Sequence, residues 1–239
     1  MHVNDFIANV QEIALQNGTH VLPKYEDIQL YRNDDVIEKF IDEFKVTKEE
    51  ASEIFSETLK FLYFAHIGHS IGQNAIITES TLIIDKMWHV FILFTKEYTN
   101  FCEKYFGRYL HHQPNTKSLV ESRRALTGEE QERRVCEIGI RLETQLKNIA
   151  KFLGEETIRK WYFDFETRYS IDQLNSLVRA IPCTINITQI STPDQLGLSE
   201  MIQEIVIRDT PRVTIRMSCG CSGTGCGAGC SCNSGSTYS

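Results

Sequence analysis

The sequence predicts a mainly α-helical, bundle-like domain, followed by a small C-terminal β element and a disordered tail rich in Cys and Gly. Three observations predict this order. Apolar residues recur at three- and four-residue steps through residues 1–181, they alternate with polar residues in parts of residues 182–217, and residues 218–239 carry no charge and consist almost entirely of Gly, Ser and Cys. A tail of that composition cannot bury a core, so we expect it to be disordered.

The helices are expected where apolar stripes begin and end at recognisable signals. Thr47 and Glu50 have the spacing of a capping box, which starts a helix, and Gly107 and Pro182 follow two of the stripes, as residues that end a helix do. The expected helices cover residues 3–17, 35–45, 47–67, 82–106, 127–153, 155–169 and 171–180. Residues 69–80 are expected to form a loop.

Beyond Pro182 the period of the apolar residues changes. Residues 183–187 and 213–217 alternate apolar and polar side chains, as strands with one buried face do. The turn signal Asp209-Thr210-Pro211 lies between two apolar runs, so we expect those runs to pair as a hairpin.

The composition excludes several classes of partner. The chain has 239 residues and a formal net charge of −7, which disfavours a surface for nucleic acid or for an anionic membrane. The N-terminus lacks the basic start and apolar stretch of a signal peptide, and no stretch reaches the roughly 18 apolar residues of a membrane-spanning helix. We therefore expect a cytoplasmic protein with reduced thiols and without nucleic-acid or membrane partners.

The most apolar of the expected helices, residues 82–106, carries two polar residues on one side. Asp85 and His89 are four residues apart, so they face the same way. One interpretation is purely structural: the two side chains bond to each other or to backbone, with Trp88 as a core residue. A metal site and an acid/base or ligand-binding pocket are the functional interpretations that stay open.

The residues around this pair form a recognisable string. Asp85-x-x-Trp88-His89 is followed by Tyr98, Phe101-Cys102, Phe106-Gly107 and His111-His112-x-Pro114. Over roughly residues 55–115 this string resembles the glycine-rich domain-containing protein-like family, with Trp88, Tyr98 and Cys102 as the motif core. The resemblance implies a helix headed by the Asp-x-x-Trp-His element and no settled activity, although plant relatives are associated with stress responses and development.

The length of the intervening chain limits which other residues can join Asp85 and His89 in a metal site. If residues 82–106 form one continuous helix, Phe106 lies about 25 Å from His89 along the helix axis. The six residues from Gly107 to His112 extend at most about 20 Å. We therefore do not expect His111 or His112 to return to His89.

Two histidines before the loop meet the reach requirement. His66 and His69 end the preceding helix, and the loop leads back to a helix start about 6 Å from Asp85. The expected metal site is therefore His66, His69, Asp85 and His89, with Glu79 as a spare ligand and with zinc or copper as the metal. The alternative is that His66 and His69 are exposed residues that stabilise the end of a helix.

Three of the cysteines precede residue 218, and five lie in the tail, residues 218–239. Cys102, Cys136 and Cys183 are expected to be small core residues. The tail holds five thiols with two Cys-x-Cys pairs, which can chelate a soft cation such as zinc or copper(I): Cys219, Cys221, Cys226, Cys230 and Cys232. The tail can equally serve as the substrate of an enzyme that modifies peptides or thiols, with the body as its carrier, or it is inert.

The leading functional interpretation is a non-enzymatic interaction or metal-handling module whose tail meets a protein partner or a modifying enzyme. The second interpretation is a hydrolase-like metalloenzyme that uses the four-residue His and Asp site. No nucleophile motif, phosphate-binding glycine loop or dinucleotide fingerprint points to another class of enzyme.

Overall fold

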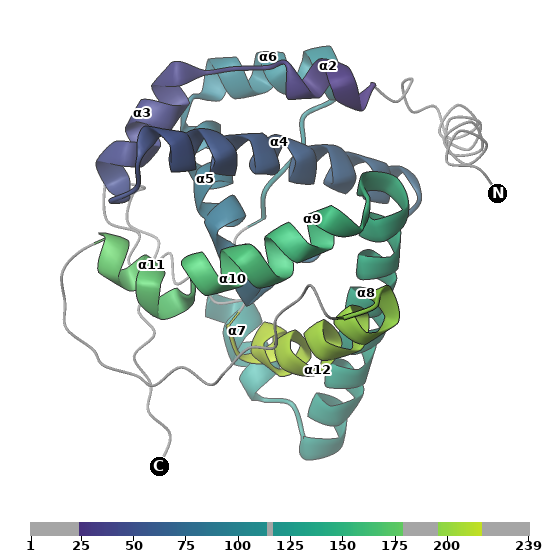
Figure 1. Ribbon diagram of the computed structural model, residues 1–239. Helices are drawn as coiled ribbons and strands as arrows, with labels where there is room; N and C mark the ends of the chain where they lie inside the picture. Colours follow the sequence, from purple (N-terminus) through teal and green to yellow (C-terminus); the bar gives the residue numbers. More distant parts are fainter. Residues whose placement is uncertain (1–23, 114–116, 179–195, 217–239) are drawn as a thin grey trace.

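A computed structural model describes residues 24–113, 117–178 and 196–216, and all regular structure in these residues is helical (Figure 1). The prediction of a mainly α fold is therefore confirmed for this part of the chain. The expected helix 3–17, the expected strand 183–187 and the tail 218–239 lie outside the described residues. None of the described helices is long and apolar enough to cross a membrane.

Helix α4 (Lys48–Ser70) is the element against which much of the N-terminal half packs. It begins at the predicted capping box: the Glu50 N–H donates to the Thr47 hydroxyl at 3.2 Å, and the Thr47 N–H donates to the Glu50 carboxylate at 2.9 Å. From Ile54 to Ser70 its residues are buried on most sides, as expected of a helix that is apolar around most of its surface. The helices packed against it are α2 (Tyr25–Gln29), α3 (Asp34–Glu43), α5 (Leu82–Leu93) and α8 (Gly128–Leu153).

The expected continuous helix 82–106 is wrong, because the structure divides it at Phe94. Helix α5 ends at Leu93 and helix α6 (Thr95–Phe106) begins one residue later, with Phe94 at ψ 65°, outside the helical range. Aromatic contacts stabilise the break: the Phe91 ring packs edge-on against the rings of Tyr98 and Phe101, with centroids 5.1 and 5.4 Å apart. The predicted end of the second helix is confirmed, since Gly107 has a φ of 64°.

The C-terminal half begins with a short helix that the sequence did not predict, α7 (Lys117–Arg124), followed by α8 at its predicted position. A continuous helical segment then covers α9 (Glu155–Arg159), the π-helix η2 (Lys160–Asp164) and α10 (Phe165–Arg168), and α11 (Ile171–Val178) follows. The Phe165 N–H reaches the carbonyl of Lys160, five residues back. This wider turn places three consecutive aromatic residues in the core: Trp161, Tyr162 and Phe163.

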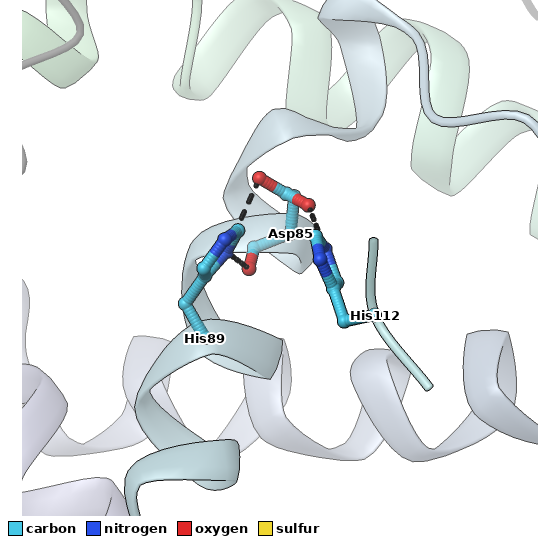
Figure 2. A group of neighbouring side chains, drawn as sticks. All are labelled: Asp85, His89 and His112. Carbon is cyan, nitrogen blue, oxygen red and sulfur yellow. Dashed lines mark hydrogen bonds and ion pairs between the residues drawn. The ribbon is translucent and has the colours of Figure 1, made fainter. Parts of the chain in front are cut away.

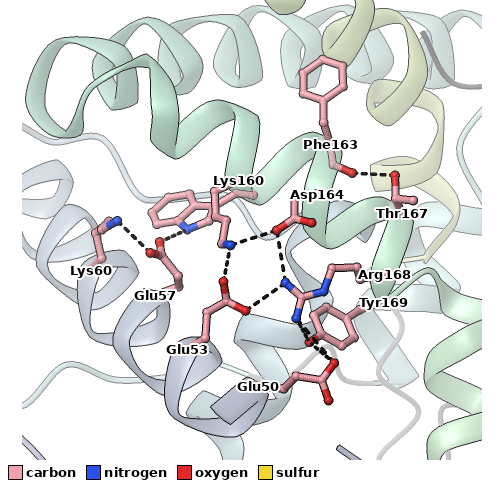
Figure 3. A network of polar contacts seen from close by, with 11 residues as sticks. Glu50, Glu53, Glu57, Lys60, Lys160, Phe163, Asp164, Thr167, Arg168 and Tyr169 are labelled. Atoms are coloured by element: carbon pink, nitrogen blue, oxygen red, sulfur yellow. Dashed lines mark hydrogen bonds and ion pairs between the residues drawn. The ribbon is translucent and has the colours of Figure 1, made fainter. Parts of the chain in front are cut away.

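A polar network joins this helical segment to α4 (Figure 3). Arg168 pairs with Glu53 at 2.9 Å and with Asp164 at 3.2 Å, and Lys160 pairs with the same two carboxylates. The Trp161 indole N–H donates to Glu57 at 2.7 Å. The ion pairs are partly exposed and contribute little each, so their main effect is to fix how the two helices align.

The expected hairpin around Asp209 is also wrong. Residues 198–216 form one helix, α12 (Leu198–Arg216), which packs on α8. Met201, Ile205 and Asp209 are fully buried at four-residue steps, which is a helical spacing. Asp209 accepts hydrogen bonds from Ser80 and Arg208, both at 2.7 Å. The residue that was expected to begin a turn is therefore a buried hydrogen-bond acceptor within a helix.

A backbone clamp holds the loop between α4 and the 3₁₀-helix η1 (Glu79–Thr81). The Gln145 side chain of α8 accepts from the Ile76 N–H at 2.6 Å and donates to the Ile76 carbonyl at 2.8 Å. At the start of this loop the backbone passes so close to α4 that a Cβ on Gly68 would lie 2.4 Å from the Gln73 carbonyl oxygen. The loop leads directly into η1 and α5 and therefore sets where α5 begins.

Replacing Gln145 by Leu is expected to lower the free energy of unfolding by about 2–4 kcal/mol. The variant keeps the size of the side chain but leaves the buried Ile76 N–H and carbonyl without their partner, each at a cost of about 1–3 kcal/mol. Urea unfolding followed by circular dichroism measures the loss. Gln131→Leu is the matched control on the exposed part of α8, with an expected change within about 0.5 kcal/mol. A loss at Gln145 as small as that of the control would contradict the clamp.

Candidate functional site

The candidate site is a buried carboxylate between two imidazole rings (Figure 2). Asp85, in the first turn of α5, has a side chain only 4% exposed. Its Oδ1 lies 2.7 Å from Nε2 of His112, and its Oδ2 lies 3.3 Å from Nδ1 of His89. The two imidazole rings are neighbours, with centroids 4.3 Å apart. Asp85 and His89 meet as their four-residue spacing predicts, and His112 joins them from a segment 27 residues further along.

His112 reaches Asp85 because the chain turns back after α6. Because of the break at Phe94, residues 82–106 do not form one straight helix, and the expectation that His112 cannot return is wrong. The Trp88 indole N–H donates to the Tyr98 hydroxyl at 2.9 Å, although residues 88 and 98 would lie about 15 Å apart along one continuous helix. The Tyr98 hydroxyl in turn donates to the Leu110 carbonyl at 2.6 Å, two residues before His112.

The electrostatics of the site favour an ionised Asp85. Burial alone raises the pKa of this carboxyl, but the hydrogen bonds from His112 and His89 outweigh burial and hold the pKa well below its usual range. For His89, burial lowers the pKa, and the contacts with the Asp85 carboxylate and with the Asp85 backbone carbonyl, 2.6 Å away, raise it by more. The site therefore holds an ionised carboxylate against two imidazoles, and the raised pKa of His89 favours its protonated form beside that carboxylate.

The donor geometry fits a divalent metal ion. Metal bonds of 2.0–2.1 Å in a tetrahedral site put neighbouring donor atoms about 3.3 Å apart. The Asp85–His89 distance already has this value, and the Asp85–His112 distance of 2.7 Å is shorter. Among the described residues, these three are the group of His, Cys, Asp or Glu side chains whose ligand atoms all lie within 4.8 Å of one another.

The other expected ligands are not part of this group. His66 is buried and stacks on the Phe106 ring, with centroids 4.8 Å apart, while His69 is exposed at the end of α4. Glu79 lies in η1, and His111 is exposed with its ring against Tyr109. The structure thus brings Asp85 and His89 together but gives them His112 in place of His66 and His69.

The cysteines are placed as follows. Cys102 is fully buried, as expected, while Cys136 is exposed on α8, which corrects its expected place in the core. Cys183 and the five tail thiols lie outside the described residues. Cys102 contacts the Leu110 backbone and Tyr98, so all three motif-core residues gather around the segment that carries His112.

The sequence itself carries a signal for His112. The string that singled out Asp85 and His89 continues to the pair at residues 111–112 and includes both members of the Trp88–Tyr98 hydrogen bond. Side chains ten residues apart cannot bond along one helix. The pattern of polar residues alone does not indicate that Trp88 and Tyr98 form a hydrogen bond. The break in the helix is not marked by a Gly or a Pro either.

Comparison with known proteins corrects the family assignment. Residues 24–136 match the model of the UCP032817-like family. The expected relation to the glycine-rich domain-containing protein-like family is therefore wrong, because the string that suggested it lies inside a match to a different family. The UCP032817-like match contains Asp85, His89 and His112 and ends within α8. No curated protein and no solved structure matches the chain.

His66 makes the stability of the fold sensitive to acid. The residue is 1% exposed, and neither ring nitrogen has a hydrogen-bond partner among the described residues. Burial, and to a smaller extent the nearby charges of Arg108 and His69, together lower its pKa to about 4. The unfolded chain binds a proton at His66 below about pH 6.5, whereas the folded chain does so only near pH 4. The stability that neutral His66 contributes is therefore complete above pH 6.5 and is lost as the pH falls toward 4.

Replacing His66 by Phe, which keeps the stacking on Phe106, is expected to make the fold less sensitive to acid. The wild-type free energy of unfolding should fall by about 2 kcal/mol more between pH 7 and pH 5 than that of the variant. Urea unfolding at the two pH values measures the difference. His69→Phe is the control, because this side chain is exposed. Equal pH dependence in wild type and His66→Phe would show that His66 is not the source.

Proposed function

We propose that the protein binds a divalent transition-metal ion through Asp85, His89 and His112. The observation that carries the proposal is the meeting of a buried carboxylate with two imidazoles from separate segments, with all ligand atoms within 4.8 Å. Burying an ionised carboxylate is costly unless it is paired. In the structure, the two imidazoles offset the free-energy cost of burying the carboxylate. A cation bound by all three side chains would offset it as well.

The donor set indicates the kind of metal. Two nitrogens and one carboxylate oxygen suit zinc and its first-row neighbours, including copper(II), better than magnesium or calcium, which prefer oxygen ligands throughout. His89 keeps a third of its side chain exposed and His112 keeps 12%, so an ion has access from solvent. Zinc is therefore the first metal to test, with cobalt(II) as its spectroscopic substitute.

A metal-dependent enzyme of the hydrolytic type is a second candidate function. Its support is the number of ligands: catalytic zinc sites have three protein ligands and keep a position open for water, whereas structural sites are closed by four. The cluster has three members among the described residues. A metal-handling role needs the same site, so metal binding is tested first.

The tail is proposed as a separate functional element that meets a protein partner or a modifying enzyme. The proposal rests on composition: residues 218–239 contain five thiols among small, uncharged residues. We also propose a cytoplasmic location, where thiols are kept reduced.

The metal site is tested in the full chain with the five tail cysteines replaced by Ser, which we call the five-serine chain. We expect this chain to bind about one zinc or cobalt(II) ion, as measured by equilibrium dialysis and elemental analysis. Asp85→Asn, His89→Ala and His112→Ala should each lower affinity by more than about 100-fold, because even residues that only orient a ligand change metal affinity 10- to 100-fold.

Two exposed histidines provide matched controls. His69→Ala and His111→Ala remove exposed imidazoles that are not members of the cluster, and they should leave the affinity unchanged. If the five-serine chain binds no metal, the proposal is wrong and the cluster is structural. If only the unaltered chain binds metal, the tail thiols are the ligands.

The tail proposal is tested by the intact mass of the full chain isolated from its native host. Modification of tail Ser, Thr or Cys residues is expected to change the mass, and fragmentation should place the change within residues 218–239. An intact mass equal to that calculated from the sequence would contradict the modification proposal.

A further inference from the structure

We propose that Tyr98 is a positioning residue that sets the metal affinity of the site by holding His112 against Asp85. This inference rests on the proposed metal-binding function. It assigns a role to the motif core, since Trp88, Tyr98 and Cys102 do not belong to the group of three ligands.

Tyr98 lies at the centre of two linked hydrogen bonds, the first of which crosses the break between α5 and α6. It accepts from the Trp88 indole at 2.9 Å and donates to the Leu110 carbonyl at 2.6 Å. Its side chain is fully buried, and the rings of Phe91 and Tyr109 each pack edge-on against it with centroids 5.1 Å away. The Tyr98 hydroxyl is therefore held in one position by packing on both sides.

The segment that carries His112 depends on these two hydrogen bonds for its position. Residues 109–113 have no regular structure, so no helix of their own orients them. The Leu110 carbonyl accepts a hydrogen bond from Tyr98, and the Leu110 backbone also contacts Cys102, one turn beyond Tyr98 in α6. Two residues later, His112 lies against the Trp88 ring with centroids 4.3 Å apart and bonds to Asp85.

The other two ligands do not need this support. Asp85 and His89 are one turn apart on the same helix, and their relative position is fixed by α5 itself. Removing the Tyr98 hydroxyl should therefore release one ligand of three and leave the other two in place. Partners that orient a metal ligand typically change metal affinity 10- to 100-fold.

The test compares cobalt(II) and zinc binding by the five-serine chain with and without Tyr98→Phe. We expect Tyr98→Phe to lower metal affinity about 10- to 100-fold and to change the visible absorption of bound cobalt(II) toward that of His112→Ala. Tyr162→Phe is the matched control, since Tyr162 is also a fully buried tyrosine whose hydroxyl is hydrogen-bonded, in its case by Gln145. The control should bind metal as the parent chain does.

A double-mutant cycle separates positioning from a general loss of stability. If Tyr98 acts through His112, Tyr98→Phe should weaken binding in the parent chain but have no further effect in a chain that carries His112→Ala. An equal loss in both backgrounds, or parent-like binding by Tyr98→Phe, would overturn the inference. If the parent binds metal and His112→Ala weakens binding, the proposed function stands whatever Tyr98→Phe does.

Trp88→Phe provides a second variant if Tyr98→Phe does not fold, as judged by circular dichroism. It removes the donor that orients the Tyr98 hydroxyl toward the Leu110 carbonyl and so weakens the hold on the segment that carries His112. It also replaces the ring against which His112 lies, so we expect metal affinity to fall by about 10-fold or more. Affinity equal to that of the parent would overturn the inference.

Discussion

The candidate site depends on the break between α5 and α6, where one residue, Phe94, leaves the helical conformation. A continuous helix would carry the chain away from Asp85 and leave Tyr98 beyond the reach of Trp88. The break folds α6 back, so that a hydrogen bond joins the two helices and a second one fastens the following segment at Leu110. The packing of Phe91 against Tyr98 and Phe101 provides apolar burial that a straight rod would lose.

The described part of the C-terminal half contributes no ligand to the site but holds the start of the helix that carries Asp85. Gln145 clamps the backbone at Ile76, and Asp209 binds Ser80, so two separate helices fix the stretch that leads into α5. Asp85 comes five residues after Ser80, in the first turn of that helix. A ligand on a helix whose start is held in this way keeps its position better than one on a free loop.

The charge of Asp85 links fold and site. Its side chain is almost inaccessible to water, and a carboxylate in that environment needs partners that favour its ionised form. His89 and His112 supply them, one from the same helix and one from the returning segment. The same charge that requires these partners for folding makes the group attractive to a cation, so the structural and the metal-binding interpretations share one set of contacts.

The sequence by itself determined the helical class, the position of most helices and the pairing of Asp85 with His89, because capping boxes, glycine stops and three- and four-residue spacings are local properties of the chain. It did not determine the break at Phe94, the helix through Asp209 or the arrival of His112. Each depends on contacts between residues far apart in sequence: Trp88 with Tyr98, Ser80 with Asp209, and Asp85 with His112. Only the tertiary structure could decide which histidine completes the site, because the distance that a segment can cover to return to Asp85 depends on where the preceding helix breaks.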